Sequence, residues 1–418
     1  MTKQILKQIW NERRSNAWLW VELLLVSVVL WIVVDWCYVM IHTYMLPKGF
    51  DIENTYLLNF GVLNSKSERY IPAESKTTTV GEDILELMDR LRHRPDVEAV
   101  SMSYNSYPYN GSNSYNGLKH DTIKVTRHRR SVTPEFFNVF KYQNVDGSGS
   151  QSLVNAFEEN TIIVPSNFWP DEYVGKELKG LEFVYMHDTT RVVRVAAITN
   201  PVKYADFRNY SSSAFYVQFV SEKEIASIND TSVDFIEFCL RVRPGTSSDF
   251  AEQLMKESSR NYIVGNCFIK GIDSFDNVRK MFHKDDMKEM KTRGYIMFFL
   301  LANIFLGIIG TFWFRTQQRR SEMGLRIALG SSAPQLKRIL ILEGLYLLAA
   351  AFIPAMIICY NIGYMDITQA WQIEWGLARF IPGILITLFL LVMMIIVGIW
   401  YPARQAMKIE PSEALRDE

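Results

Sequence analysis

The sequence carries none of the short motifs by which many enzymes are recognised. It has no Gly-x-x-x-x-Gly-Lys-Ser/Thr stretch, and therefore no phosphate-binding loop for ATP hydrolysis. It has no His-Glu-x-x-His and no Gly-x-Ser-x-Gly pattern, and its six histidines are scattered without metal-ligand spacing. We therefore expect no catalytic residues, no metal site and no cofactor within this chain.

Cysteine is scarce, and neither sign of charge is in excess. Of the four cysteines, Cys37 and Cys359 fall in apolar runs, whereas Cys239 and Cys267 lie in the region between them. That second pair is compatible with a disulfide or with two buried thiols, and the sequence leaves both open. The 45 basic and 45 acidic residues balance, and we expect no nucleic-acid partner.

The apolar residues, 48% of the chain, are concentrated in four runs. Each run has roughly the 20 residues that a helix needs to cross a bilayer. The first is too long for the apolar part of a signal peptide and is followed by no small-residue cleavage site, so we interpret it as a retained span. The four runs are Trp18–Met40, Tyr295–Phe314, Ile339–Tyr360 and Phe380–Tyr401.

The basic residues of the short loops predict the orientation of the spans. They cluster before the first span, after the second and after the fourth, while the loop after the third span has Arg379 as its single basic residue. Because such residues favour the inner side, both termini are expected inside and the large region after the first span outside.

The expected organisation follows from these spans. It consists of an amphipathic interfacial helix (1–16), a first span (17–41), an outer domain with a stalk (42–291), a second span (292–314), an inner segment (315–338), a third span (339–360), a short outer loop (361–379), a fourth span (380–401) and an inner tail (402–418).

Two acidic residues, Glu22 and Asp35, interrupt the first span. Each lies near one end, where its side chain can reach the interface, although a charge in hydrocarbon is costly. An ion or proton relay would need partners at mid-depth, for which Asn303 and Glu343 are the candidates. We favour a structural or interfacial role.

The outer domain alternates strand and helix patterns. Thr55–Val62 and Val97–Ser103 are typical of strands, and between them Ile84, Leu87, Met88 and Leu91 share one helix face. A second set follows about 130 residues later, with a strand at Val233–Val242, a helix at Asp249–Arg260 and a strand at Tyr262–Ile269. This predicts a split β-α-β core within an α+β domain, interrupted by a β-rich subdomain over about 106–224.

Two stretches of that insertion have open interpretations. Ser103–Gly117 is polar, turn-rich and contains four tyrosines. It suits a recognition loop, although we favour a plain exposed loop. The basic run Arg127–Arg130 suits an acidic partner or a lipid headgroup, but a solvated strand face is the more ordinary interpretation.

The inner segment 315–338 has clear helix punctuation. Gly330 suits a helix end, because glycine adopts the left-handed conformation at little steric cost. Ser332 is expected to cap the next helix, with Pro334 in its first turn and Gln335 completing a capping box. We expect a rigid helix held between two spans by a tight turn, which is a part suited to passing force.

This segment resembles the corresponding part of the MacB/FtsX-like permeases of ABC transporters. The resemblance rests on Arg320-Ser-Glu-Met-Gly-Leu-Arg-Ile-Ala-Leu-Gly-Ser-Ser, on Glu343-Gly344 at the start of the third span, and on Pro402-Ala-Arg-Gln-Ala with Pro411-Ser-Glu-Ala-Leu-Arg at the C-terminus. Val132–Phe140 with Asp146-Gly147 resembles the family's periplasmic core domain. One departure is the acidic pair in the first span, which the family usually keeps apolar.

The resemblance implies a half-transporter that dimerises, with itself or a paralogue, on separate ATPase subunits that bind ATP and Mg. It implies a bacterial inner-membrane location, and an adaptor and outer-membrane channel are further potential partners. The residues that would seat the inner helix on the ATPase are Glu322, Gly324, Leu325, Arg326, Ala328, Leu329 and Gly330. Further family positions are Glu343, Gly344, Pro402, Ala403, Arg404, Pro411, Ala414, Leu415 and Arg416.

Three functions stay open at this point. The first is ATP-driven expulsion or extraction of a drug, peptide or lipoprotein from the outer side. The second is transmission of a signal to an outside hydrolase or from a sensed peptide, and the third is a receptor that transports nothing. A basic loop that merely obeys the inside-positive rule is the plain alternative to an ATPase-docking helix.

Overall fold

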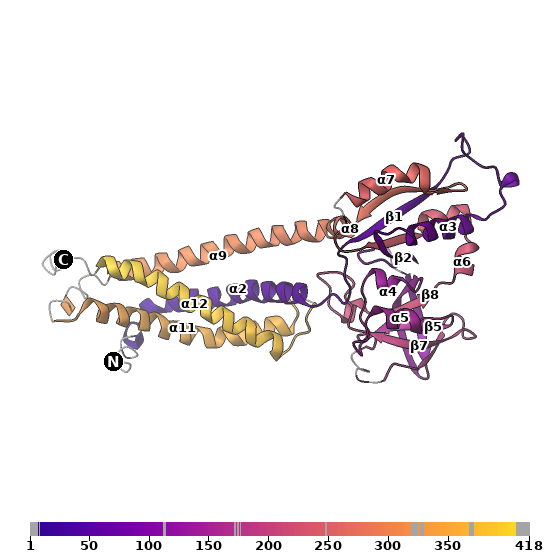
Figure 1. Cartoon of the computed structure of the whole chain (residues 1–418). Coiled ribbons are helices and arrows are strands. Elements are labelled where there is room, and N and C mark those ends of the chain that lie inside the picture. Colours follow the sequence, from indigo (N-terminus) through magenta and orange to yellow (C-terminus); the bar gives the residue numbers. More distant parts are fainter. Residues whose placement is uncertain are drawn as a thin grey trace. The chain divides into compact units, whose positions relative to one another are not determined.

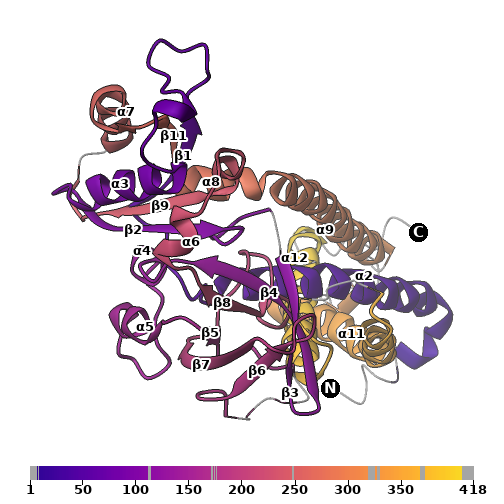
Figure 2. The same cartoon turned by 90° about the vertical axis from the view of Figure 1, so that its right-hand side faces the viewer.

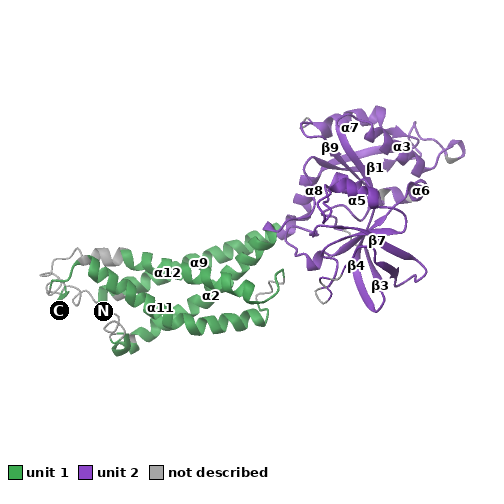
Figure 3. Ribbon diagram, turned by 60° about the horizontal axis from the view of Figure 1, so that its bottom comes forward, with its two compact units in different colours: residues 1–44, 287–418 green, residues 45–286 purple. Residues whose placement is uncertain are grey.

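The computed structural model describes residues 7, 9–111, 114–170, 173, 175, 177–246, 249–318, 325–326, 330–367 and 372–406. It divides into two compact units (Figure 3). Unit 1 comprises residues 1–44 and 287–418, and unit 2 comprises residues 45–286. Each unit has a hydrophobic core of its own. The expected fold class, a four-helix membrane part with a large α+β domain, is confirmed.

Unit 1 is built from four long helices, shown with their labels in Figure 1. Within the described residues, each is long and apolar enough to cross a membrane. In α9 the helix continues beyond the apolar run, where Glu289 and Arg293 form an ion pair of 2.6 Å one turn apart. The helices are α2 (Arg13–Met45), α9 (Lys284–Gln318), α11 (Ala333–Tyr364) and α12 (Leu377–Ala406).

The core of unit 2 is a split β-α-β arrangement. Its strands lie in the order β11-β1-β9-β2, and each neighbouring pair is antiparallel. The first half is β1 (Thr55–Val62), α3 (Val80–Arg92) and β2 (Val97–Tyr104). The second half is β9 (Glu237–Val242), α7 (Phe250–Asn261), the short β10 (Ile263–Val264) and β11 (Cys267–Ser274).

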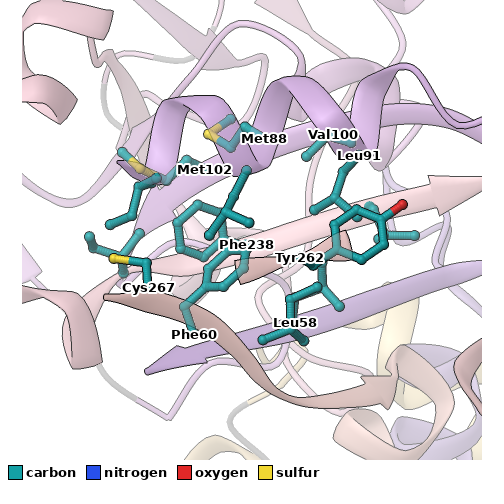
Figure 4. Packing of buried hydrophobic residues seen from close by; sticks show 14 of the residues in the cluster. Leu58, Phe60, Met88, Leu91, Val100, Met102, Phe238, Tyr262 and Cys267 are labelled. Carbon is teal, nitrogen blue, oxygen red and sulfur yellow. The ribbon is translucent and has the colours of Figure 1, made fainter. Parts of the chain in front are cut away.

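Helix α3 shows how local sequence and packing agree. Thr79 and Glu82 form a capping box at its start, which satisfies two backbone N–H groups. The predicted apolar face is buried against the sheet, where Met88 and Leu91 contact the same core as Phe60 and Phe238 (Figure 4). The two phenylalanine rings meet edge-on with centroids 4.0 Å apart.

The insertion between β2 and β9 extends the same sheet to eleven strands. Six of its strands follow in the order β4-β3-β6-β7-β5-β8, and a parallel pairing of β8 with β4 closes them into a ring. Its elements are β3 (Ser114–His120), β4 (Ile123–Val132), α4 (Phe136–Val139), α5 (Ser150–Ala156), β5 (Thr161–Pro165), β6 (Glu182–Tyr185), β7 (Val192–Thr199), η3 (Ser211–Ser213), β8 (Phe215–Phe219), α6 (Glu222–Ala226) and η4 (Asp230–Phe235).

Two strand expectations are wrong in detail. The stretch Tyr262–Ile269 is not one strand, because Gly265 has a φ of 53° and turns the chain between β10 and β11. The stretch Val233–Val242 begins in the 3₁₀ helix η4, and β9 starts at Glu237. Cys239 and Cys267 are buried thiols and form no disulfide.

The expectation of a plain exposed loop over Ser103–Gly117 is also wrong. The carboxylate of Glu237 accepts hydrogen bonds from the backbone N–H of Ser106 and of Tyr107 and from the side chain of Asn110. This draws the loop inward, and residues 114–117 belong to β3. Burial raises the pKa of Glu237.

The basic run on β4 is likewise not a fully solvated face. Arg130 is buried and donates a hydrogen bond of 2.5 Å from Nη1 to the Asn105 carbonyl, and its guanidinium lies 5.3 Å from the Tyr204 ring centroid. Arg127 donates from Nε to the Phe168 carbonyl. Both arginines therefore bind within the domain.

Two further elements belong to unit 2. The loop from β1 to α3 contains a short 3₁₀ helix, η1 (Ala73–Ser75). After β11, helix α8 (Phe275–Phe282) is capped by Ser274 and ends at His283, directly before α9.

Candidate functional site

The segment expected to dock on an ATPase is described in part. Leu325 and Arg326 are helical, and Leu325 is 50% exposed. The backbone N–H of Ser331 donates to the Arg326 carbonyl at 2.9 Å, and Gly330 has a φ of 93°. This is the left-handed helix end expected of that glycine. Glu322, Gly324, Ala328 and Leu329 lie outside the described residues.

The start of α11 directly follows this turn and is itself capped. Ser332 and Gln335 form the expected capping box, in which the Gln335 Oε1 accepts from the Ser332 N–H at 3.0 Å. Pro334 occupies the first turn. Three consecutive constraints, at Gly330, Ser332 and Pro334, leave the turn little conformational freedom.

Glu343 and Gly344 lie where three helices of unit 1 meet. Glu343 is buried, with 4% of its surface exposed. A Cβ on Gly344 would lie 3.0 Å from Ile395, 3.1 Å from Ile399 and 3.2 Å from Phe312. The glycine therefore permits close contact of α11 with α12 and α9, as small residues do between membrane helices.

The C-terminal family positions are only partly described. Pro402, Ala403 and Arg404 continue α12 as helix. Pro411, Ala414, Leu415 and Arg416 lie outside the described residues. Near this end of α12, the Lys337 Nζ of α11 lies 5.1 Å from the Trp400 ring centroid. In the part of the chain that the structure describes, no group of His, Cys, Asp and Glu is arranged to hold a metal ion.

The position of Asp35 near one end of the first span suggested that its side chain reaches the membrane interface. The structure shows a different arrangement. Asp35 is fully buried and accepts two hydrogen bonds from Arg379, at 2.9 Å from Nε and 2.5 Å from Nη2. Arg379 is 2% exposed, bonds the Ile373 carbonyl and lies 5.4 Å from the Trp375 ring centroid. A bidentate, desolvated ion pair thus connects α2 with the start of α12.

Glu22 also has a partner within unit 1. It is partly buried, and both of its carboxylate oxygens lie 3.0 Å from the Thr311 hydroxyl of α9. Asn303, a candidate relay partner, instead donates to the Phe299 carbonyl of its own helix. The acidic pair of the first span therefore forms helix-to-helix contacts, which favours the structural role over a relay.

In unit 2, Asp206 contacts basic side chains from distant parts of the chain. It lies between β7 and β8, is 2% exposed, and accepts a hydrogen bond from the Tyr109 hydroxyl at 2.8 Å. Arg279 of α8 approaches at 2.6 Å and Lys48, just after α2, at 3.7 Å. His283, between α8 and α9, has its Nε2 3.6 Å away.

These contacts set the charge state of the carboxyl. Burial acts to raise the pKa of Asp206, but the hydrogen bond from Tyr109 and the charges of Lys48 and Arg279 outweigh it and hold the pKa below its usual range. Sequence reasoning missed this residue, and also Arg379 as a partner of Asp35. The one available signal for the latter was that Arg379 is the single basic residue of the short outer loop and that Asp35 lies near the outer end of the first span.

Comparison with known proteins places this geometry in context. Residues 294–411 match the family model described as FtsX-like permease C-terminal. The periplasmic region of MacB from Actinobacillus actinomycetemcomitans is similar at 12% identity and a TM-score of 0.32, over 56% of this chain and 94% of that one. A domain of a putative permease from Porphyromonas gingivalis is similar at 14% identity and 0.32, over 55% and 93%.

The extracellular domain of the ABC-type transporter YknZ from Gram-positive bacteria is similar at 8% identity and a TM-score of 0.29, over 51% of this chain and all (100%) of that one. Comparison with curated proteins finds no match.

Proposed function

Because the chain belongs to the MacB/FtsX-like family of ABC-transporter permeases, we propose that it passes motion of separate ATPase subunits across the membrane to unit 2. In this proposal residues 322–330 dock on the ATPase at the cytoplasmic side of the inner membrane, where both termini also lie. The permease acts as a pair with itself or a paralogue, and expels or extracts its substrate from the outer side.

The observation that carries the proposal is the constrained turn from Gly330 to Ser332, directly before α11. The left-handed conformation of Gly330 and the reciprocal hydrogen bonds of Ser332 and Gln335 restrict the backbone conformation where the chain enters α11. On the other side of the segment, α9 is one 35-residue helix from Lys284 to Gln318. A displacement at Gly330 is therefore passed into α11 through a turn that has little conformational freedom.

The Asp206 cluster supports transmission within unit 2. Helix α8 leads directly into α9, and Asp206 binds Arg279 of α8 and contacts His283 between the two helices. Asp206 itself belongs to the insertion. A pull on α8 thus reaches the six-stranded ring through a buried, charge-assisted contact as well as through the backbone.

Reversal of the Arg326 charge tests the docking role. In Arg326→Glu we expect the permease to insert and to bind lipid normally, but to lose its stimulation of ATP hydrolysis by the partner ATPase. Co-reconstitution in nanodiscs with the purified ATPase measures this directly. Arg326→Lys, which keeps the charge, should retain part of the stimulation, and Lys66→Glu, on an exposed loop of unit 2, should retain all of it.

Normal coupling in Arg326→Glu would contradict the assignment and leave residues 315–338 as an ordinary basic loop. Transport is then separated from signal transmission by reconstituted vesicles. ATP-dependent release of substrate supports the permease role, whereas activation of an added extracytoplasmic hydrolase without release supports transmission.

A further inference from the structure

The chain bends where it enters the first long helix of unit 1. The buried side chain of Asn16 donates a hydrogen bond from Nδ2 to the Ile9 carbonyl at 2.9 Å. In a straight helix these two residues would lie about 10 Å apart along the axis, which is too far for this bond. The chain instead turns at Glu12, directly before α2. Figure 2 shows the short segment before α2 bent away from the end of that helix.

Two tryptophans lie on either side of this bend and are largely exposed. Trp10 is 70% exposed and Trp18 is 76% exposed. The apolar stretch that is long enough to cross a membrane begins between them, at Asn16. Tryptophan is enriched where membrane helices pass the lipid headgroups, because its ring is apolar and its N–H group is polar. The bend is therefore suited to the level of the headgroups.

Each of these tryptophans has an arginine close to it. The Arg13 Cζ lies 5.9 Å from the Trp10 ring centroid. Arg14 precedes Trp18 by one turn of α2 and shares its face of the helix. Both arginines are exposed, and in the part of the chain that the structure describes no acidic side chain pairs with either of them. Their guanidinium groups can therefore bind an anion from outside the chain.

The place of the two arginines within α2 also favours an external anion. Both lie in the first turn of the helix, which contains no acidic residue. The N-terminal end of a helix carries a partial positive charge, so the helix dipole disfavours cations there. A phosphate group at this turn offsets that repulsion. Arginine suits phosphate in particular, because its planar guanidinium can donate two parallel hydrogen bonds to one phosphate.

We propose that this bend binds the headgroup of an anionic phospholipid. Arg13 and Arg14 hold the phosphate, and the rings of Trp10 and Trp18 lie beside the glycerol and the upper part of the acyl chains. A zwitterionic lipid carries a cationic group next to its phosphate, which the two arginines repel, so the site selects lipids with a net negative charge. This lipid site does not depend on the proposed transport function.

The test uses the full chain in micelles of an uncharged maltoside detergent. The probe is dioctanoyl phosphatidylglycerol, an anionic phospholipid, and native mass spectrometry counts the lipids bound at each concentration. Dioctanoyl phosphatidylcholine, with the same acyl chains and no net charge, is the matched control, and glycerol phosphate is the soluble control. We expect phosphatidylglycerol to bind more tightly than phosphatidylcholine, with a preference that falls as salt is added, and glycerol phosphate not to compete.

Variants of the two arginines assign the binding to the bend. Arg13→Gln and Arg14→Gln should each weaken phosphatidylglycerol binding by about fivefold, and the double glutamine variant by roughly 20-fold. The double lysine variant keeps both charges and should stay within about threefold of the original affinity. Arg293→Gln, whose arginine already pairs with Glu289 on α9, should leave the affinity unchanged. A thermal unfolding curve checks that the double glutamine variant is folded.

Equal affinity for the two lipids, or an unchanged affinity for phosphatidylglycerol in the folded double glutamine variant, would overturn the proposal. Displacement of the lipid by an equal concentration of glycerol phosphate would also overturn it, in favour of a soluble phosphate ligand. A loss in Arg293→Gln as large as in Arg13→Gln would show that overall charge, and not this bend, attracts the lipid. Because no ATPase is present, these results are independent of the coupling measured for Arg326→Glu.

Discussion

The buried ion pair between Asp35 and Arg379 gives the sharpest test of how the membrane helices are held together. In Asp35→Asn the shape of the side chain is kept, but Arg379, which is 2% exposed, loses its counter-charge. Breaking a buried pair in this way costs about 3–5 kcal/mol. The Ile373 carbonyl and the Trp375 ring still contact the guanidinium, so we expect a loss near the lower end, about 3 kcal/mol.

Removing both charges should be milder than removing one. In the double variant Asp35→Leu with Arg379→Met no buried charge is left unpaired, and we expect it to be more stable than Asp35→Asn by about 1–3 kcal/mol. The free energy of unfolding in mixed micelles, titrated with a denaturing detergent, measures each variant. Glu22→Gln is the matched control. Its contact with the Thr311 hydroxyl is partly exposed, and we expect a loss of about 0.5–1 kcal/mol.

Two results would refute this reasoning. A loss below about 1 kcal/mol in Asp35→Asn would place the pair among weak surface contacts. If the double variant loses the sum of the losses measured for Asp35→Leu alone and Arg379→Met alone, the two side chains act independently, which their bidentate contact forbids.

Three further predictions concern packing and pH. Gly344→Val should lower the free energy of unfolding by about 1–3 kcal/mol, measured in the same micelles, because its Cβ alone already lies 3.0 Å from Ile395. Asp206→Asn should cost about 2–4 kcal/mol at neutral pH, by thermal or chemical unfolding, since it leaves buried partners unpaired. The pKa of Asp206 is lower in the folded protein than in the unfolded chain. The contribution of its carboxylate to the free energy of unfolding is therefore present above the ordinary pKa of 3.8 and is lost as the pH falls through the folded pKa. In Asp206→Asn the free energy of unfolding should accordingly depend less on pH at the acid end. Burial, with the charges of Arg130 and Arg127, lowers the pKa of His128 to about 4, so stability should fall as the pH drops from 6.5 toward 4, and a His128→Gln variant should lose less stability over that interval.

Local elements were predictable where one helix face or one strand face is buried. The apolar residues of α3 recur at helical spacing and all lie in one core, and Gly330 and Ser332 adopt the conformations that their chemistry favours. In these cases the signal is contained in a few consecutive residues. The role of the docking segment in coupling stays a prediction.

Long-range polar contacts were not predictable in the same way. Asp35 and Arg379 are 344 residues apart, and either residue alone is equally compatible with an interfacial position. Glu237 lies more than 120 residues from the loop that it holds, so the turn-rich composition of that loop indicated exposure when the carboxylate in fact buries it. A single sequence records which residues are polar but not which of them meet.

The two acidic residues of α2 form contacts of unequal strength with neighbouring helices. This difference bears on which helices move together. Lipid tails are as apolar as leucine side chains, so polar contacts weigh heavily in holding membrane helices side by side. Asp35 binds α12 through a buried bidentate pair, whereas Glu22 binds α9 through one hydroxyl at a partly exposed site. In its most apolar stretch 11% of α9 is buried, against 39% for each of the other three helices. Motion of α9 should therefore break the contact with Glu22 first, and α2 should remain with α12. A cysteine crosslink between α2 and α12 should be tolerated during ATP hydrolysis, while one between α2 and α9 should stop coupling.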